Sequence, residues 1–389
     1  MSLVAKASTD QVVAPVVLLE DDSQYFGGLK WLANAWHEEW LSESWYQKQL
    51  ARSWHQKSTL SAERVTPFTD FLSTYDECDK RLALHLLFTY YRKLFDGDFD
   101  DKIERQDARQ SRDDFCEFIK YLSKVYPETG KLLENFDYDD ITPVPILTRE
   151  GVAKVIEYYQ DRDKLPLEVF QCKSFLQVFD RLLELKEKPE GTRYCFIVRC
   201  FFGGRYPLFE RAVHKLAVIA SKEQGKIKLF LSDSLGVSSA IYCLIMFMNR
   251  NDSPEYVELF RSIAEIAFIV IPRQKDGATC ATYAIKDLIA LVKDQAMETL
   301  AVYDLFSDPD LPQDKFQELQ KKFPSLTLRG CYPNAKMMKS SQDVKKMSGE
   351  EKARLGKYLR SVEKLPERNY LPQHRAMRMF EIALNKHCF

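Results

Sequence analysis

The stretch 265–292 constrains the fold of this chain more than any other, because its pattern predicts a strand, a tight turn and a buried helix in succession. Residues 265–272 form a short apolar run rich in β-branched side chains, which is typical of a buried strand. Gly277 lies in the turn. After Cys280 the apolar residues follow the i, i+3, i+4, i+7 spacing of a helix packed on a core: Ala281, Ala284, Ile285, Leu288, Ile289 and Val292. The pattern therefore places Cys280 at the start of a helix.

Cys280 at a helix N-terminus is a candidate nucleophile. Free backbone N–H groups and the positive end of the helix dipole point toward that position, and such an environment lowers the pKa of a thiol. Gln274 lies six residues upstream and can offer an amide N–H to the same point, as an oxyanion-hole donor would. The alternative is that Cys280 is one more small buried hydrophobe among nine cysteines.

A candidate base and a candidate acid lie upstream on two consecutive strand-like runs. His214 opens the run 213–220, the turn Gln224-Gly225 follows, and the run 226–235 contains Asp233 near its end. An antiparallel hairpin closed at Gly225 would bring His214 and Asp233 to one rim of a sheet. A carboxylate there can hold the tautomer of the imidazole and stabilise its charged form. Taken singly, His214 reads equally as a strand-edge histidine and Asp233 as the N-cap of a helix at 237–248.

The order His214, Asp233, Gln274, Cys280 resembles that of the adenain-like clan of cysteine proteases. This clan includes SUMO proteases, adenoviral proteinase, bacterial effector deubiquitinases and the YopJ-type effector acetyltransferases. Asp233-Ser234-Leu235 resembles the end of the acid-bearing strand in SUMO proteases, and Gln274 matches the oxyanion-hole glutamine. The resemblance covers roughly residues 194–295. The chain departs from the pattern at two positions, with Lys215 in place of the usual Trp and Ala281 in place of Gly.

The resemblance implies a cysteine protease that cleaves ubiquitin or a ubiquitin-like modifier from protein conjugates, most like a bacterial effector deubiquitinase. In that reading His214 is the base, Asp233 orients it, Cys280 attacks the carbonyl and Gln274 binds the oxyanion. The first alternative is a YopJ-like acetyltransferase that uses acetyl-CoA on the same triad, together with an inositol phosphate activator. The second is a catalytically silent binding module. Neither a cofactor nor a metal ion is expected.

The fold predicted from these features is α+β, with a papain-like core built on a small central sheet. A mostly helical N-terminal region, residues 1–145, would select the target, residues 146–300 would form the catalytic core, and residues 301–389 would add basic helices. All five tryptophans lie within the first 54 residues, where they form either a helical core or a binding surface. From residue 321 to the end, sixteen Lys and Arg face six Asp and Glu, a basic stretch that could contact phosphate-rich ligands.

Composition narrows the partners and the compartment. A net charge of −1 makes nucleic acid an unlikely partner by default, and no run reaches the ~20 apolar residues of a transmembrane helix. The cysteines have no regular spacing and an odd count, which favours a reducing compartment without a disulfide framework. No secretory signal is visible. We therefore expect a cytosolic protein, and the resemblance implies one that a bacterium delivers into a host cell.

Overall fold

The computed structural model describes residues 119, 127–138, 143–162, 168–201, 213–250, 253–292, 300, 302–308, 311–341, 369 and 371–388. Its contacts divide the chain into two units. The first comprises Met1–Gly130, Asp140–Pro143 and Leu384–Phe389, and the second comprises Lys131–Asp139 and Val144–Ala383. The second unit contains all four candidate site residues and is the one described below. The predicted helical region with its tryptophans lies almost entirely outside the described residues.

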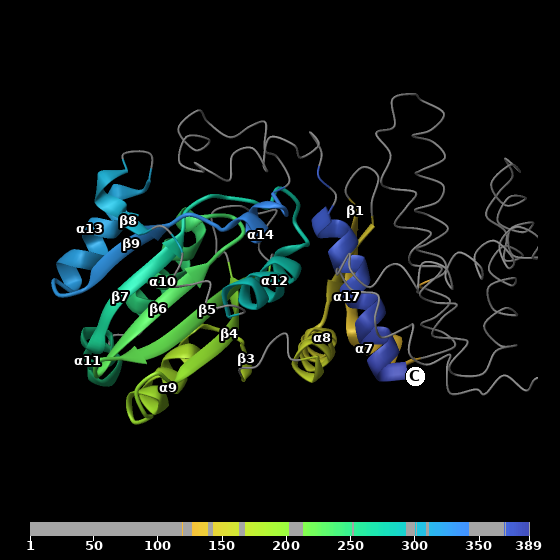
Figure 1. Ribbon diagram of the computed structural model, residues 1–389, viewed down its shortest axis with the longest axis horizontal. Helices are drawn as coiled ribbons and strands as arrows, with labels where there is room; N and C mark the ends of the chain where they lie inside the picture. The colour runs from red at the N-terminus through yellow and green to blue at the C-terminus, as the bar shows by residue number, and fades with distance from the viewer. Residues whose placement is uncertain are drawn as a thin grey trace, which may run out of the picture. The chain divides into compact units, whose positions relative to one another are not determined.

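A seven-stranded mixed sheet is the centre of the second unit (Figure 1). In spatial order the strands are β3 (Val169–Cys172), β4 (Arg193–Phe201), β5 (Val213–Glu223), β6 (Lys226–Ser232), β7 (Ile263–Ile269), β9 (Thr327–Cys331) and β8 (Val302–Asp304). Three pairs are parallel, β3 with β4, β6 with β7 and β7 with β9, and three are antiparallel, β4 with β5, β5 with β6 and β8 with β9.

The hairpin of β5 and β6 forms where the sequence predicts it. Glu223 pairs with Lys226, so Gln224 and Gly225 are the two residues of the loop. Both have positive φ, 53° and 73°, which is the geometry of the two-residue turn that matches the right-handed twist of paired strands. Because the turn fixes the register, the first residues of β5 and the residues just after β6 lie at the same end of the hairpin.

Helices flank this sheet, and a small two-stranded sheet of β1 (Leu133–Tyr138) and β2 (Pro143–Leu147) precedes it. None of the helices in the described part of the chain is long and apolar enough to cross a membrane. The helices whose bounds lie within the described ranges are α7 (Thr129–Leu132), α8 (Arg149–Asp161), α9 (Phe175–Lys186), α10 (Val237–Arg250), α11 (Pro254–Ser262), α12 (Cys280–Val292), α13 (Gln313–Lys322), α14 (Ala335–Met338) and α17 (Leu371–Cys388), with a 3-10 turn η5 at Leu305–Ser307.

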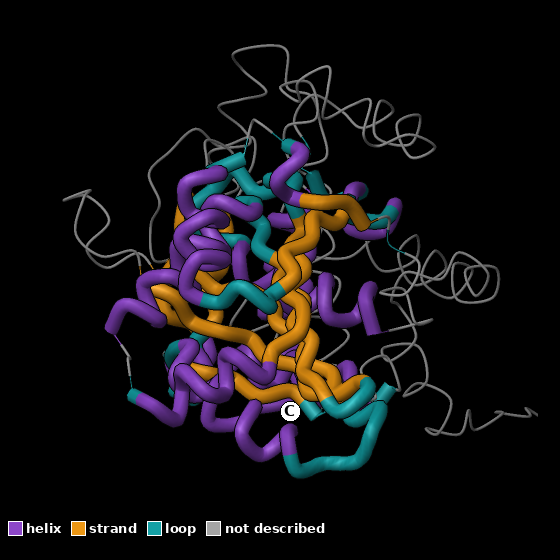
Figure 2. Tube along the Cα trace, turned by 90° about the vertical axis from the view of Figure 1, so that its left-hand side faces the viewer, coloured by secondary structure: helices purple, strands orange, loops and turns teal. Residues whose placement is uncertain are grey.

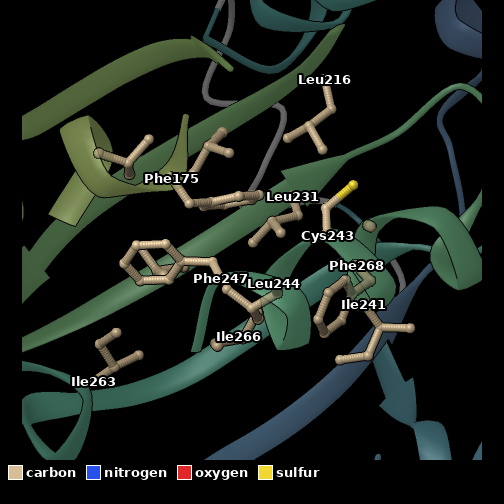
Figure 3. Packing of buried hydrophobic residues seen from close by; sticks show 14 of the residues in the cluster. Phe175, Leu216, Leu231, Ile241, Cys243, Leu244, Phe247, Ile263, Ile266 and Phe268 are labelled. Carbon is tan, nitrogen blue, oxygen red and sulfur yellow. The ribbon is translucent and has the colours of Figure 1, made fainter. Parts of the chain in front are cut away.

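The two faces of the sheet are buried under different helices. On one face, side chains of β4 to β7 pack with apolar residues of α9, α10, α11 and α13. Figure 3 shows part of this packing, between residues of β5, β6 and β7 and residues of α9 and α10. Phe179 of α9 stacks on Phe247 of α10 and Phe260 of α11 there. The residues that alternate with this set, such as Ile197 and Ile219, are equally buried. Since successive side chains of a strand point to opposite faces, they face α12, which contacts β4 and β5.

The structure confirms a central sheet flanked by helices and corrects its extent. Figure 2 shows the strands lying among helices, as an α+β core requires. The sheet is larger than the small one predicted, because β3 lies outside β4 at one edge and β9 and β8 extend the other edge. The expectation that residues 301–389 add helices is therefore only partly right, since β8 and β9 lie there as well. Three-residue β8 and five-residue β9 are too short to give a periodic signal.

Candidate active site

His214 and Asp233 meet in a buried contact at the open end of the β5–β6 hairpin. The Nε2 atom of His214 lies 2.7 Å from Oδ1 of Asp233, and the two residues are only 4 % and 0 % exposed. The same Oδ1 accepts the backbone N–H of Leu235 at 2.8 Å, in a turn that Gly236 completes with φ 92°. A side chain at Gly236 would press against Pro272, so the turn also seats the loop that leads to Cys280. The predicted base and acid are thus brought together.

Cys280 is the first residue of α12, as the sequence predicts. Its thiol is hydrogen-bonded to the His214 side chain. Since Nε2 of that ring is engaged by Asp233, Nδ1 is the nitrogen left for the thiol. Cys280, His214 and Asp233 therefore form one line of contacts, although they come from a helix, a strand and a turn.

The electrostatics of this line favour a thiolate beside an imidazolium. Burial by itself would raise the pKa of Cys280, but the His214 hydrogen bond and charge, and then the charge and backbone N–H of Lys215, lower the pKa below its ordinary value. Burial would likewise lower the pKa of His214. The Asp233 carboxylate, followed by Cys280, more than offsets burial and raises that pKa to about 10. A nucleophile that is already ionised can attack without waiting for a base.

Lys215 contributes to the site although it breaks the family pattern. Its Nζ donates to the backbone carbonyl of Leu147 at 2.9 Å, which anchors the ammonium group. Both its charge and its backbone N–H lower the pKa of Cys280. Sequence reasoning registered Lys215 only as a departure from Trp. A cation directly after the candidate base was the available signal.

Gln274 lies in the loop before α12 but its side chain is held by that loop. Its Nε2 donates to the backbone carbonyl of Asp276 at 2.7 Å, and its Oε1 accepts from Ser234 at 2.5 Å. The backbone N–H groups of Arg273 and Gln274 both donate to the Ser234 carbonyl. The structure therefore ties Gln274 to the turn after Asp233. Its role as an oxyanion donor remains a prediction.

Asp276 organises the loop and was missed by sequence reasoning. Its Oδ1 accepts the backbone N–H groups of Ala278 and Thr279, the two residues before α12, at 3.0 and 2.8 Å, and so caps the turn that leads into the helix. Oδ2 accepts from Gln373 of α17 at 3.0 Å. An Asp a few residues before a predicted helix is a recognisable capping signal. Here the cap holds the helix that begins with the candidate nucleophile.

Comparisons with known proteins give a likeness of structure only. No protein-family model and no curated protein matches the chain. Similar solved structures include HopZ1a in complex with IP6, at 10 % identity over 61 % of this chain and 85 % of that chain, with a TM-score of 0.39. AvrA delL154 with IP6 and CoA is 12 % identical over 70 % of this chain and 98 % of that chain, with a TM-score of 0.36.

A third solved structure, HopZ1a in complex with IP6 and CoA, is 11 % identical over 61 % of this chain and 85 % of that chain, with a TM-score of 0.36. The likeness to these three structures is weak. At these identities and TM-scores it assigns no activity to the present chain.

Proposed function

We propose that this protein is an acyl-transfer enzyme with Cys280 as its nucleophile. The observation that supports the proposal most is the buried contact of His214 with Asp233 at 2.7 Å, together with the hydrogen bond from the same imidazole to a thiol at a helix start. Cys280, His214 and Asp233, joined in this order by hydrogen bonds, fit the roles of nucleophile, base and orienting acid. A silent binding module would not need a thiol whose pKa is lowered despite burial.

The reaction runs in two halves. The Cys280 thiolate attacks the carbonyl carbon of an acyl donor, and the electron pair of the C=O bond moves to oxygen. Collapse of that intermediate expels the leaving group, which takes the proton from the imidazolium of His214 and leaves a thioester on Cys280. An acceptor hydroxyl, amine or water then attacks the thioester while His214 takes its proton. Collapse returns the thiolate, and Asp233 again faces an imidazolium.

The two enzymatic expectations from the sequence, cleavage of a ubiquitin-like modifier and acetyl transfer from acetyl-CoA, differ in the acyl donor. The triad serves acetyl-CoA and a ubiquitin C-terminus equally, because both present a carbonyl carbon. Two of the three complexes compared above contain CoA, and ubiquitin has no counterpart among them. We therefore propose acetyl transfer from acetyl-CoA to a protein hydroxyl or amine as the first activity to test, with cleavage of a ubiquitin-like modifier as the second candidate.

IP6 belongs in the same test. All three compared complexes contain it, and the stretch from residue 321 onward has a net charge of +10, from sixteen Lys and Arg against six Asp and Glu. We propose that IP6, or another polyanion of similar charge density, binds this chain and raises its activity. Much of that stretch lies outside the described residues, so the proposal rests on its charge.

The deciding experiment exposes the full-length protein to radiolabelled acetyl-CoA, with and without IP6, and in parallel to a ubiquitin that carries a C-terminal electrophile. Wild type should acquire an acetyl label that hydroxylamine removes from Cys280, and Cys280→Ala should not. An adduct with the ubiquitin electrophile at Cys280 and no acetyl label would replace acetyl transfer by hydrolysis. Absence of both products, while Cys280 still alkylates readily, would favour the binding module.

A further inference from the structure

The groups of the candidate site come from four separate pieces of chain. His214 opens β5, Asp233 follows β6, Gln274 lies in the loop after β7, and Cys280 begins α12. Attack by a thiolate needs reacting atoms placed to within a fraction of an ångström. Something must therefore fix the loop and the helix against the end of β6. Backbone pairing does this for β5 and β6, but α12 is in no ladder.

Arg273 makes the required connections, and it is almost completely buried at 1 % exposure. Its guanidinium grips Asp287 of α12 with two hydrogen bonds, Nη1 to Oδ1 at 2.7 Å and Nη2 to Oδ2 at 2.5 Å. Nη2 also lies 3.2 Å from Oγ of Ser232, the last residue of β6. The hydroxyl of Ser232 in turn donates to Oδ2 of Asp287 at 2.6 Å. One side chain thus joins loop, strand and helix.

The backbone of Arg273 adds two more connections. Its N–H donates to the Ser234 carbonyl at 2.7 Å, and its carbonyl accepts the phenol of Tyr283 at 2.9 Å. The guanidinium carbon also lies 5.3 Å from the centre of the Tyr283 ring. Tyr283 belongs to the first turn of α12. Arg273 is therefore attached to α12 at two positions after Cys280, which are Tyr283 and Asp287.

Helix geometry explains why Asp287 is an effective point of attachment. It lies seven residues after Cys280, which is two turns, so the two side chains share one face of α12 about 10 Å apart along the axis. A bidentate grip at Asp287 resists rotation of the helix about its own axis. Such a rotation would swing the thiol of Cys280 away from His214.

A gain in stability alone does not explain why Arg273 and Asp287 are buried as an ion pair. Removing an Arg and an Asp from water carries a desolvation penalty, and well-packed apolar residues at such positions often give a fold that is equally stable. Around the pair, apolar packing of α12 is already extensive, with Ile285, Leu288 and Leu291 buried. The two hydrogen bonds between the guanidinium and the carboxylate fix the orientation of both side chains, and apolar packing cannot do this.

We propose that Arg273 and Asp287 are positioning residues, which hold the rotational setting of α12 so that the thiol of Cys280 stays in contact with His214. The inference deepens the proposed function, since it assigns to these residues the alignment of that nucleophile and base. This positioning role does not depend on which acyl donor the enzyme uses.

The test compares alkylation of Cys280 by iodoacetamide across pH in folded variants. The double variant Arg273→Met, Asp287→Leu removes both charges and keeps apolar bulk. Arg273→Lys keeps the positive charge and loses the pair of hydrogen bonds that a guanidinium makes to a carboxylate. The titratable groups near the thiol are His214 and Lys215 on β5, Asp233, and Cys200 on β4, and both variants keep these residues. The charge of Arg273 also acts on Asp233, and the double variant removes this charge together with that of Asp287. Because Arg273→Lys keeps both charges, a shift of its alkylation profile reports the geometry of the thiol.

In the double variant we expect the alkylation midpoint to move up by about 1 pH unit, with about tenfold slower alkylation below it. Arg273→Lys should shift the midpoint in the same direction by less. The matched control is Arg181→Met, Glu184→Leu, which removes an exposed Arg–Glu pair of α9 and should leave the profile unchanged. A double variant that folds with the wild-type midpoint and wild-type acyl transfer would overturn the proposal.

Two features keep this result separate from the proposed function. Alkylation needs no acyl donor, so the positioning role is tested even if wild type transfers no acyl group. If the double variant does not fold, Arg273→Lys decides, because it retains the buried charge pair. A wild-type midpoint in folded Arg273→Lys, with unchanged turnover, would then count against positioning.

Discussion

Cys280 and two cysteines of the sheet, Cys195 and Cys331, are all buried, but their thiol pKa values are shifted in opposite directions. Cys195 of β4 and Cys331 of β9 are 0 % and 2 % exposed, and Cys280 is 5 % exposed. Burial raises the pKa of Cys195 and of Cys331 to about 12. At Cys280 the same burial is outweighed by His214 and Lys215, and the pKa is lowered. Burial therefore does not decide whether a thiol reacts; the charges and N–H groups aimed at it do.

The difference also separates the two readings that the sequence left open for Cys280. A small buried hydrophobe has the environment of Cys195, where the charge of Arg193 opposes burial but does not outweigh it. Cys280 instead lies beside an imidazole that a buried carboxylate keeps protonated. The local sequence places Cys280 at a helix start, but it does not show which charges face the thiol.

The largest expected effect comes from removing the sulfur itself. Cys280→Ala should abolish acyl transfer, because no other group can form the thioester, while its melting temperature stays near that of wild type. The matched variant Cys331→Ala removes a sulfur that is equally buried and should keep most of the activity. Turnover and thermal melts of the two proteins check this. If Cys280→Ala were active, the nucleophile would have to be another residue.

Asp233→Asn should come next, with turnover lower on the order of 10³-fold. Loss of the carboxylate lets the pKa of His214 fall from about 10 toward its usual value, so the imidazolium disappears at lower pH and the thiolate population at neutral pH drops. The measurement is the rate of iodoacetamide alkylation from about pH 5 to about pH 10. In wild type the thiolate forms above the lowered pKa of Cys280, and its imidazolium partner persists up to about pH 10.

Normal alkylation and normal turnover in Asp233→Asn would remove Asp233 from the site. Its buried contact with His214 would then have to be structural.

Gln274→Ala should lower kcat by about 10²-fold, because it removes a donor to charge that develops only in the transition state. Simple alkylation of Cys280 forms no oxyanion and should stay near the wild-type rate. The hydrogen bonds of Gln274 to Asp276 and Ser234 define the competing role, which is to hold the loop. Equal loss of alkylation and turnover would show that Gln274 acts by holding the loop.

Lys215→Met should have the smallest effect, about a threefold slower alkylation near neutral pH, because the charge acts at a distance through partly screened surroundings. Lys222→Met is the matched control. Lys222 lies on the same strand and also donates to backbone carbonyls, those of Lys186 and Lys188, but does not contribute to the pKa of Cys280. Identical alkylation profiles for both variants would restrict the contribution of Lys215 to its backbone N–H.

The sequence by itself determined the local parts of the site. The two-residue turn at Gln224-Gly225 and the alternation of the flanking runs set the register of β5 and β6, so His214 and Asp233 could be placed at one rim. The apolar spacing after Cys280 determined that α12 begins there. Each of these signals is short-range, because turn geometry and helical periodicity are properties of neighbouring residues.

Only the tertiary structure decided what surrounds these parts. Strands β3, β8 and β9 join the sheet by pairing across long stretches of chain, and their brevity leaves no periodic pattern. The grip of Arg273 on Asp287 and the approach of Lys215 to Cys280 depend on how α12 docks on the sheet. Charges act through space, so their effect on a thiol is fixed only when the fold sets the distances. For that reason the sequence could nominate Cys280, while its lowered pKa follows from the packed structure.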